Sequence, residues 1–248
     1  MHHIDTYVAH RVARGELVTS SAATIAPILR QWHRHAGPID AWTAEAAARW
    51  VHAPHLRPNS RKGRLSRLRP YTAWLVATGD LAVDVSLGVP PVKIPPPDPR
   101  DMRPADVGTL LASVPDERAR LVVLLMVHCG LRCVDMSRVR VEDVDVARRL
   151  LAVRAKGGRG EVTHTVPVPE EAWATLAPYL AASGRRSGPL VCASNRVAPT
   201  AVSANRLSVL VRRWIADAGL KVVAWDGCSA HALRHTCAQG MIDAGADI

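Results

Sequence analysis

The sequence has no phenylalanine, only five cysteines, and no long apolar run in its 248 residues. The lack of 18 consecutive apolar residues excludes a transmembrane helix. The first 17 residues, MHHIDTYVAHRVARGEL, carry charges throughout and lack the apolar core of a secretory signal. Five cysteines form no even disulfide framework, so reduced thiols are the simplest expectation. We therefore expect a cytoplasmic protein with no membrane partner.

Acidic residues are scarce relative to basic ones. The chain has 22 Asp and Glu against 32 Lys and Arg, a formal net charge of +10. A surplus of this size favours a polyanionic partner, most simply nucleic acid. The hydrophobic fraction of 48% is that of a folded protein. The glycine-rich nucleotide-binding P-loop pattern is absent, so the KGGRG segment at 156–160 does not indicate ATP binding.

Proline is concentrated in one segment, residues 88–100, which divides the chain. Its six prolines cannot lie in a helix interior and favour an extended linker. Apolar residues recur with helical spacing on both sides. The predicted helices are 21–34, 43–51 and 60–78 before the linker and 103–111, 117–129, 170–182, 200–218 and 229–245 after it. Pro70 is expected to kink or divide the third of these.

Alternating apolar residues on either side of KGGRG predict a β-hairpin. The expected fold is therefore mainly α with a small β-hairpin or sheet. We expect a helical domain at 1–87, a linker at 88–100 and an α+β domain at 101–248.

A dense basic cluster lies at the start of the third predicted helix. Helical spacing is expected to put its members on a broad face opposite Leu65 and Leu68, where they would contact DNA phosphates. A solvated helix face is the alternative. The cluster consists of Arg57, Arg61, Lys62, Arg64, Arg67 and Arg69.

A second basic constellation comes from separate parts of the sequence. Arg132 follows Gly130 at the end of an apolar helix, and Lys156 lies at the mouth of the hairpin turn. His231 and Arg234 are three residues apart and share a helix face. The blocks GLRCVDM at 130–136, AKGG at 155–158 and HALRHT at 231–236 have the order found in the tyrosine recombinases, the phage integrase family.

The chain resembles this family over nearly its whole length. Asp135 stands where glutamate is commoner. The resemblance implies a helical, SAM-like core-binding domain at 1–87 and a catalytic domain at 101–248. It implies site-specific cleavage and rejoining of double-stranded DNA through a 3′-phosphotyrosine and a Holliday junction, in a bacterial or phage-infected cell.

The resemblance also assigns roles to the second constellation. Arg132 and Arg234 would bind the non-bridging phosphate oxygens, which suit bidentate guanidinium donors. Lys156 would protonate the departing 5′ oxygen as general acid. His231 would bond the phosphate or help to deprotonate the nucleophile, and His235 would support the site. No metal or cofactor is implied, because the protein–DNA bond conserves the phosphodiester energy.

The family's nucleophilic tyrosine has no match. The only tyrosines are Tyr7, Tyr71 and Tyr179, and none follows Arg234. We therefore expect a chain truncated before its nucleophile, which binds DNA without cleaving it. The full-length protein would form a homotetramer on DNA, and this fragment a monomer. Integrase, resolvase and transposon recombinase all remain open.

Two other interpretations are retained. Cys228, His231, His235 and Cys237 have a spacing that could hold zinc through thiolates and imidazoles. Alternatively, the chain could be a non-catalytic DNA-binding regulator or scaffold with a recombinase fold. The presence of all four basic site residues argues against this alternative, because a pure binder does not need them together.

Overall fold

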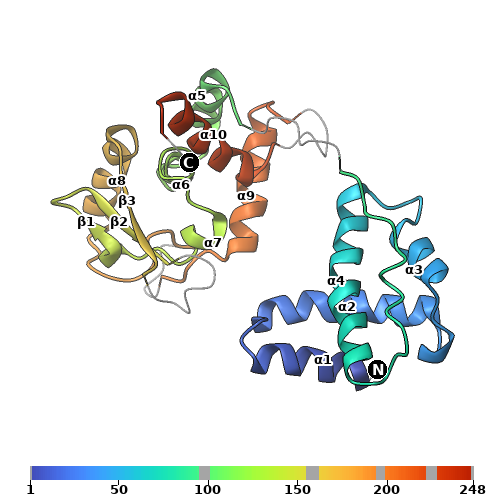
Figure 1. The fold of residues 1–248 in the computed structure, drawn as a ribbon. Coiled ribbons are helices and arrows are strands. Elements are labelled where there is room, and N and C mark those ends of the chain that lie inside the picture. The colour runs from blue at the N-terminus through green and yellow to red at the C-terminus, as the bar shows by residue number, and fades with distance from the viewer. Residues whose placement is uncertain (1, 95–100, 155–161, 194–198, 222–227, 247–248) are drawn as a thin grey trace. The chain divides into compact units, whose positions relative to one another are not determined.

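The computed structural model describes residues 2–94, 101–154, 162–193, 199–221 and 228–246. The chain divides into two compact units, residues 1–96 and 97–248, and each has its own hydrophobic core (Figure 1). The boundary falls inside the proline-rich segment. The expectation of a mainly α-helical protein with a small sheet is confirmed.

Helices and short turns form the described part of the first unit. The helices are α1 (His2–Ala13), α2 (Thr19–Ala36), α3 (Ala44–Val51) and α4 (Pro58–Ala77), with a 3₁₀ turn at Ile39–Ala41. Helix α1 was not predicted, because it buries only Ile4 and Tyr7 and has little apolar periodicity. Pro70 lies inside α4 without dividing it, so the expected division of that helix is wrong.

Tryptophan and tyrosine take the place of phenylalanine in this core. The ring of Trp32 lies 5.1 Å from that of Trp42 and 5.5 Å from that of Trp50, measured between centroids. Tyr71 is fully buried, and its hydroxyl lies 2.8 Å from His33 Nε2. The polar atom of this large ring is thus satisfied inside the unit.

The second unit surrounds one central helix. Its helices are α5 (Pro104–Ser113), α6 (Glu117–His128), α7 (Cys133–Met136), α8 (Glu170–Ser183), α9 (Ala204–Asp217) and α10 (Ala230–Asp243). Residues 121–127 of α6 are all buried, which a helix apolar on every side requires. Helices α8 and α10 pack against α6 (Figure 1).

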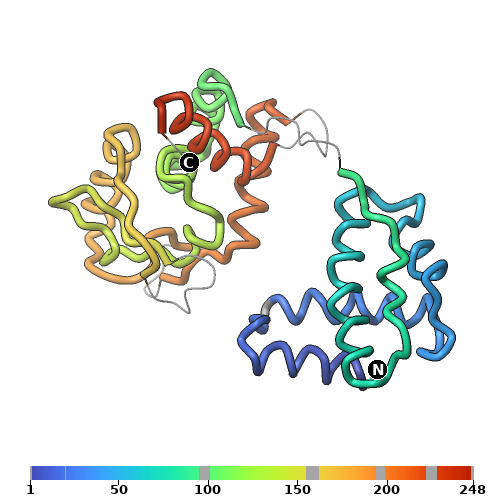
Figure 2. The backbone as a smooth tube through the Cα atoms, viewed as in Figure 1, coloured from blue at the N-terminus to red at the C-terminus, as the bar shows by residue number. Residues whose placement is uncertain are grey.

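A three-stranded antiparallel sheet completes this unit. Its order is β1 (Val144–Asp145), β2 (Leu150–Val153) and β3 (His164–Pro167), and Leu151 pairs with Val166. Between α7 and the sheet lies a 3₁₀ turn, Val141–Asp143. The chain leaves α6 through α7, crosses the sheet, and returns through α8 and α9 to α10 (Figure 2). None of the helices in the described ranges is long and apolar enough to span a bilayer.

Candidate active site

Three of the four predicted site residues line one pocket. Arg132, His231 and Arg234 surround an open cavity of about 340 Å³ in the second unit. Arg132 comes from the turn after α6, whereas His231 and Arg234 come from α10. The other lining residues are Cys133, Val134, Ala204, Asn205, Ser208, Ser229 and Ala230. This lining contains no Asp or Glu, so the pocket suits an anion.

Arg132 is fixed by its backbone and keeps its side chain accessible. It is the N-cap residue of α7, and its backbone N–H donates to Asp135 Oδ2 at 2.9 Å. The Asp135 side chain is only 3% exposed, whereas the Arg132 side chain is 47% exposed. The distance between Asp135 Oδ2 and Arg132 Nη1 is 3.9 Å. The buried carboxylate therefore anchors the turn and leaves the guanidinium open to the pocket.

Helix α10 presents His231 and Arg234 from its first two turns. Ser229 caps the helix, with its hydroxyl accepting from the His231 backbone N–H at 3.3 Å. His231 is exposed, and its ring lies 4.4 Å from that of His235, in an edge-on arrangement. Farther along, Thr236 Oγ1 accepts from the Met102 N–H at 2.7 Å, which ties α10 to the segment preceding α5.

Arg234 joins α10 to the end of α6. Its Nη1 donates to the carbonyl oxygen of Gly130. Gly130 has a φ of +62°, a left-handed conformation that glycine adopts without strain. A Cβ at this position would lie 3.3 Å from Cys237 Sγ and 3.7 Å from Arg234 Nη1. The glycine therefore permits both the turn and the close packing of α10 beside it.

The cysteines near the contact between Arg234 and the Gly130 carbonyl are uncharged. Burial raises the pKa of Cys129 to about 12, and the nearby Cys237 thiol adds to this effect. Burial also raises the pKa of Cys237, although Arg234 partly offsets this, and it raises the pKa of Cys133. These thiols remain protonated at neutral pH and add no negative charge that would compete with a phosphate for the arginines.

Lys156, the fourth predicted residue, lies outside the described residues. The strand that leads to it is well anchored. Arg154, directly after β2, forms an ion pair with the buried Asp143, whose Oδ2 also accepts from the Arg140 N–H at 2.8 Å.

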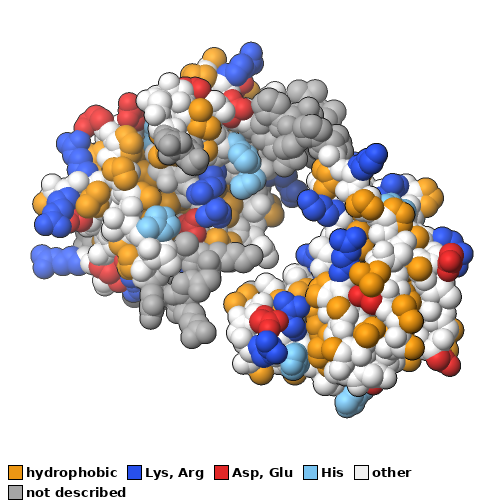
Figure 3. All heavy atoms as spheres, viewed as in Figure 1, with side chains coloured by type: hydrophobic (Ala, Val, Ile, Leu, Met, Phe, Trp, Pro, Cys, Tyr) orange, Lys and Arg blue, Asp and Glu red, His pale blue; other side chains and the backbone are white. Residues whose placement is uncertain are grey.

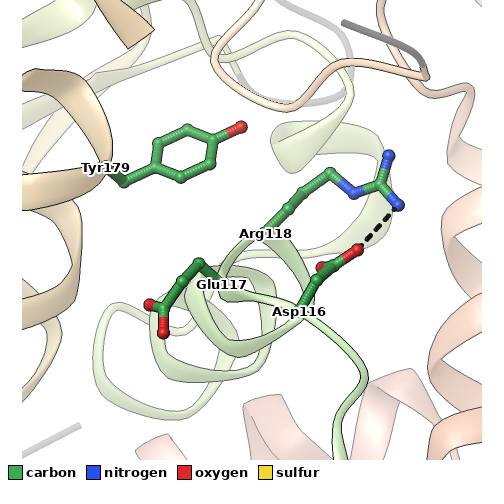
Figure 4. Close-up of a pocket in the computed structure, with 4 residues that line it drawn as sticks. All are labelled: Asp116, Glu117, Arg118 and Tyr179. Atoms are coloured by element: carbon green, nitrogen blue, oxygen red, sulfur yellow. Dashed lines mark hydrogen bonds and ion pairs between the residues drawn. The ribbon is translucent and has the colours of Figure 1, made fainter. Parts of the chain in front are cut away.

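None of the three tyrosines lines the arginine pocket. Tyr7 and Tyr71 are buried in the first unit. Tyr179 lines a separate cavity of about 380 Å³ with Asp116, Glu117 and Arg118, at the start of α6 (Figure 4). Its hydroxyl donates to the Leu190 carbonyl at 3.2 Å. A 12-residue helix is about 18 Å long, so α6 separates this cavity from Arg132.

The predicted DNA-binding cluster divides into two groups in the structure. Arg57, Lys62 and Arg69 are exposed. Figure 3 shows that Lys and Arg side chains lie at the surface of both units. Arg61 and Arg64 are half-buried and donate to the carbonyls of Pro54 and Trp50, at 3.2 and 2.6 Å. The expected position opposite Leu68 is therefore wrong for these two, because they share its face and cover the turn between α3 and α4. Arg67 is half-buried and donates to the Gly63 carbonyl at 2.9 Å.

The alternative zinc site does not assemble. The Cys237 thiol donates to the His128 carbonyl at 3.5 Å, and within the described ranges no three His, Cys, Asp or Glu side chains are gathered as ligands. Sequence reasoning also missed Asn205 and Ser208, which α9 contributes to the arginine pocket. Two polar residues three apart on a helix look like any solvated face, so the sequence carries no signal for them.

Known proteins share this sequence pattern and this fold. Residues 100–248 match the phage integrase family model. The chain is 28% identical to tyrosine recombinase XerA of Thermococcus kodakarensis over 207 residues, which cover 83% of this chain and 70% of XerA. It is 30% identical to XerA of Pyrococcus furiosus over 158 residues, covering 63% and 52%. It is 28% identical to XerC of Mycobacterium sp. strain KMS over 243 residues, covering 90% and 71%.

Solved structures agree on the fold. A lambda integrase (75–356) dimer bound to a COC′ core site has a TM-score of 0.77 at 17% identity, covering 96% of this chain and 88% of that one. The Tn1549 transposon integrase (82–397) with circular intermediate DNA has a TM-score of 0.75 at 16% identity, covering 99% and 88%. The family model covers more than half of the residues, and the blocks that carry Arg132, His231 and Arg234 lie within it. The chain therefore belongs to the phage integrase family of tyrosine recombinases.

Proposed function

We propose that this chain belongs to a recombinase that cuts and rejoins double-stranded DNA at a specific site. In this proposal, the pocket of Arg132, His231 and Arg234 receives the phosphate at which the strand is cut. The observation that carries the proposal is the meeting of these three side chains around one open pocket, although α7 and α10 lie far apart in the sequence.

The chemistry of the pocket suits a phosphodiester in transition. Two guanidiniums can donate paired hydrogen bonds to the non-bridging oxygens and stabilise the charge that grows on a pentavalent phosphorus. Arg234 uses part of its guanidinium on the Gly130 carbonyl, which holds its remaining donors in place. Lys156 is proposed as the acid that protonates the departing 5′ oxygen, and His231 as a further phosphate or proton-transfer contact.

The proposal gives the first unit a DNA-binding role and the second unit the catalytic one. The exposed Arg57, Lys62 and Arg69 would contact phosphates beside the cut site. Double-stranded DNA is the proposed partner, acting in the cytoplasm. A lambda integrase tetramer bound to a Holliday junction has a TM-score of 0.74 with this chain, which supports the proposal of a homotetramer on DNA. For this chain alone in solution we propose a monomer.

A test of the pocket starts by finding its DNA. Sheared DNA of the source organism, retained on the chain and sequenced, should be enriched in one locus with a short imperfect inverted repeat. Single phosphates of that site are then replaced by uncharged methylphosphonates. At one phosphate in each half-site, we expect the replacement to weaken binding by about 1.5–3 kcal/mol, the value of a hydrogen bond to a charged group.

The same penalty should become smaller in Arg132→Ala and in Arg234→Ala, because each variant removes one of the two guanidiniums that pair with this phosphate. Arg213→Ala is the matched control, since Arg213 lies on α9 outside the pocket and pairs with Asp217 at 3.5 Å. A methylphosphonate scan with no position that couples to either arginine would refute the proposal.

A non-catalytic DNA-binding regulator is the second candidate, and it is favoured by the position of the three tyrosines outside the pocket. The methylphosphonate scan separates the two candidates. A regulator needs only phosphates spread over the interface, so no single phosphate should couple to both Arg132 and Arg234.

A further inference from the structure

A second basic pocket lies in the first unit, outside the cluster predicted at 57–69 except for Arg64. It is a cavity of about 420 Å³ among α2, α3 and α4. None of its lining residues is acidic. Its basic or titratable members are Arg34 and His35 from the end of α2, Arg49 from α3, His55 from the following turn, and Arg64 from α4.

Arg64 is a preorganised cation at the edge of an aromatic wall. Its guanidinium carbon lies 4.5 Å from the centroid of the Trp50 ring, and its Nη1 donates to the Trp50 carbonyl at 2.6 Å. Trp50 is buried and packs on Trp32. Burial lowers the pKa of Arg64 from its ordinary value, yet a guanidinium stays charged at neutral pH. The charge is therefore held in position before any ligand arrives.

Arg34 and Arg49 complete the cationic lining from the solvent side. Both are exposed, and within the described part of the chain neither makes an ion pair. Glu45 precedes Arg49 by one helical turn. Its pKa is lowered mainly by hydrogen bonds to its own backbone N–H and to Thr43, and least by Arg49. The guanidinium of Arg49 is thus available to a ligand.

Three guanidiniums around one concave surface repel one another until an anion binds. A phosphate group matches them best, because it offers several oxygens to planar, forked donors. The amide of Gln31, at the same rim, can add a neutral hydrogen bond. We propose that this pocket binds a phosphate group of a nucleic-acid backbone through Arg34, Arg49 and Arg64, as a second grip separate from the Arg132–Arg234 pocket. This inference rests on the proposed function only for the identity of the polyanion, which is DNA.

Salt dependence tests the binding of a nucleic-acid phosphate. For duplex DNA, the slope of log K against log salt falls by about 0.9 for each phosphate that the protein no longer neutralises. We expect the double variant Arg34→Ala/Arg49→Ala to lower the slope by about 0.9 or more. Arg34→Lys/Arg49→Lys should keep most of it, because the charges remain. The matched control is Arg14→Ala, since Arg14 is exposed in the same unit, pairs with Glu16 at 2.7 Å and lies outside the pocket.

Inorganic pyrophosphate tests the alternative that the pocket binds a small phosphate ligand instead of a nucleic-acid backbone. Its binding is followed by NMR on the whole chain through the Trp50 indole signal, assigned with Trp50→Phe. A pyrophosphate-induced shift that the double alanine variant abolishes, together with an unchanged DNA salt slope, would overturn the nucleic-acid source and support a small phosphate ligand instead. An unchanged slope with no Trp50 shift overturns the whole inference.

The result is separable from the recombinase proposal. The double alanine variant should keep the methylphosphonate penalty that depends on Arg132 and Arg234, because those side chains lie in the other unit. A reduced penalty in the Arg132 and Arg234 variants, and an intact penalty with a reduced salt slope in the Arg34/Arg49 variant, would establish two independent phosphate sites. Both substituted residues are exposed, so the thermal unfolding of the variant should match that of the wild type.

Discussion

The joint between α6 and α10 makes Gly130→Ala an informative substitution. A non-glycine residue in the left-handed region costs about 1–2 kcal/mol. The new Cβ would also lie 3.3 Å from Cys237 Sγ on α10, so Cys237 must give way by a few tenths of an ångström. Overpacking of this kind costs about 1–3 kcal/mol. The expected loss in the free energy of unfolding is therefore about 2–5 kcal/mol in total.

Gly184→Ala is the matched control. Gly184 ends α8 with a φ of +60°, nearly that of Gly130, but its Cβ would meet nothing within 4 Å. This variant carries only the backbone term of about 1–2 kcal/mol. At about 2–4 °C per kcal/mol for a domain of this size, the two melting temperatures should differ by several degrees. Calorimetry of both variants measures the contact separately from the backbone strain.

The same substitution tests how Arg234 is held. Arg234 lies one helical turn before Cys237 and donates to the Gly130 carbonyl, so we expect the crowding in Gly130→Ala to disturb this guanidinium and to reduce the methylphosphonate penalty at the cut site as well. Gly184→Ala should leave that penalty unchanged. Equal destabilisation by the two alanines, with the penalty intact in both, would refute the argument that Gly130 positions Arg234.

Three further predictions concern other groups. The chain should form no SDS-resistant adduct with its DNA site, because Tyr7, Tyr71 and Tyr179 all lie outside the arginine pocket; a covalent band on a denaturing gel would contradict this. Burial lowers the pKa of His33 from 6.5 to about 4, so between these pH values His33 binds a proton in the unfolded chain but not in the folded chain. Stability should therefore fall as pH drops from about 6.5 towards 4, and urea unfolding of His33→Gln should show a weaker dependence in that window. Burial raises the pKa of Cys129 from 9.0 to about 12, so its thiolate fraction at neutral pH should be about a thousandfold smaller than that of an ordinary cysteine. Iodoacetamide labelling followed by mass spectrometry should therefore be far slower in the native than in the unfolded chain. Equal labelling rates would count against the burial of Cys129.

Most helices were predictable because their periodicity and caps are local. Thr43 and Asp116 cap α3 and α6 where the sequence changes from polar to apolar. By contrast, α1 was missed because most of its surface is polar, and it is held by packing of Tyr7 on Tyr71 and Trp74. The expected division of α4 at Pro70 was wrong for a related reason, since packing of α4 through Leu68, Tyr71 and Leu75 overrides the cost of a proline.

The site divides in the same way. Arg132, His231 and Arg234 could be selected from the sequence because their blocks have a recognisable order, whereas the pocket that they line is visible only in three dimensions. The direction of Arg61 and Arg64 could not be predicted, because it depends on the carbonyls of Pro54 in the preceding turn and of Trp50 in α3. The pocket of Arg34 and Arg49 was invisible for the same reason, since its members come from three helices.

The hydrogen bond between Arg234 and the Gly130 carbonyl joins residues 104 positions apart, so the two residues are synthesised at different times. At about 5–20 residues per second, the ribosome needs roughly 5–20 seconds to travel from one to the other. During most of that interval the nascent chain contains Arg132 but not Arg234. Translation that stops before α10 thus releases a chain that has Arg132 but lacks Arg234, so the proposed phosphate pocket can form only after α10 has been synthesised.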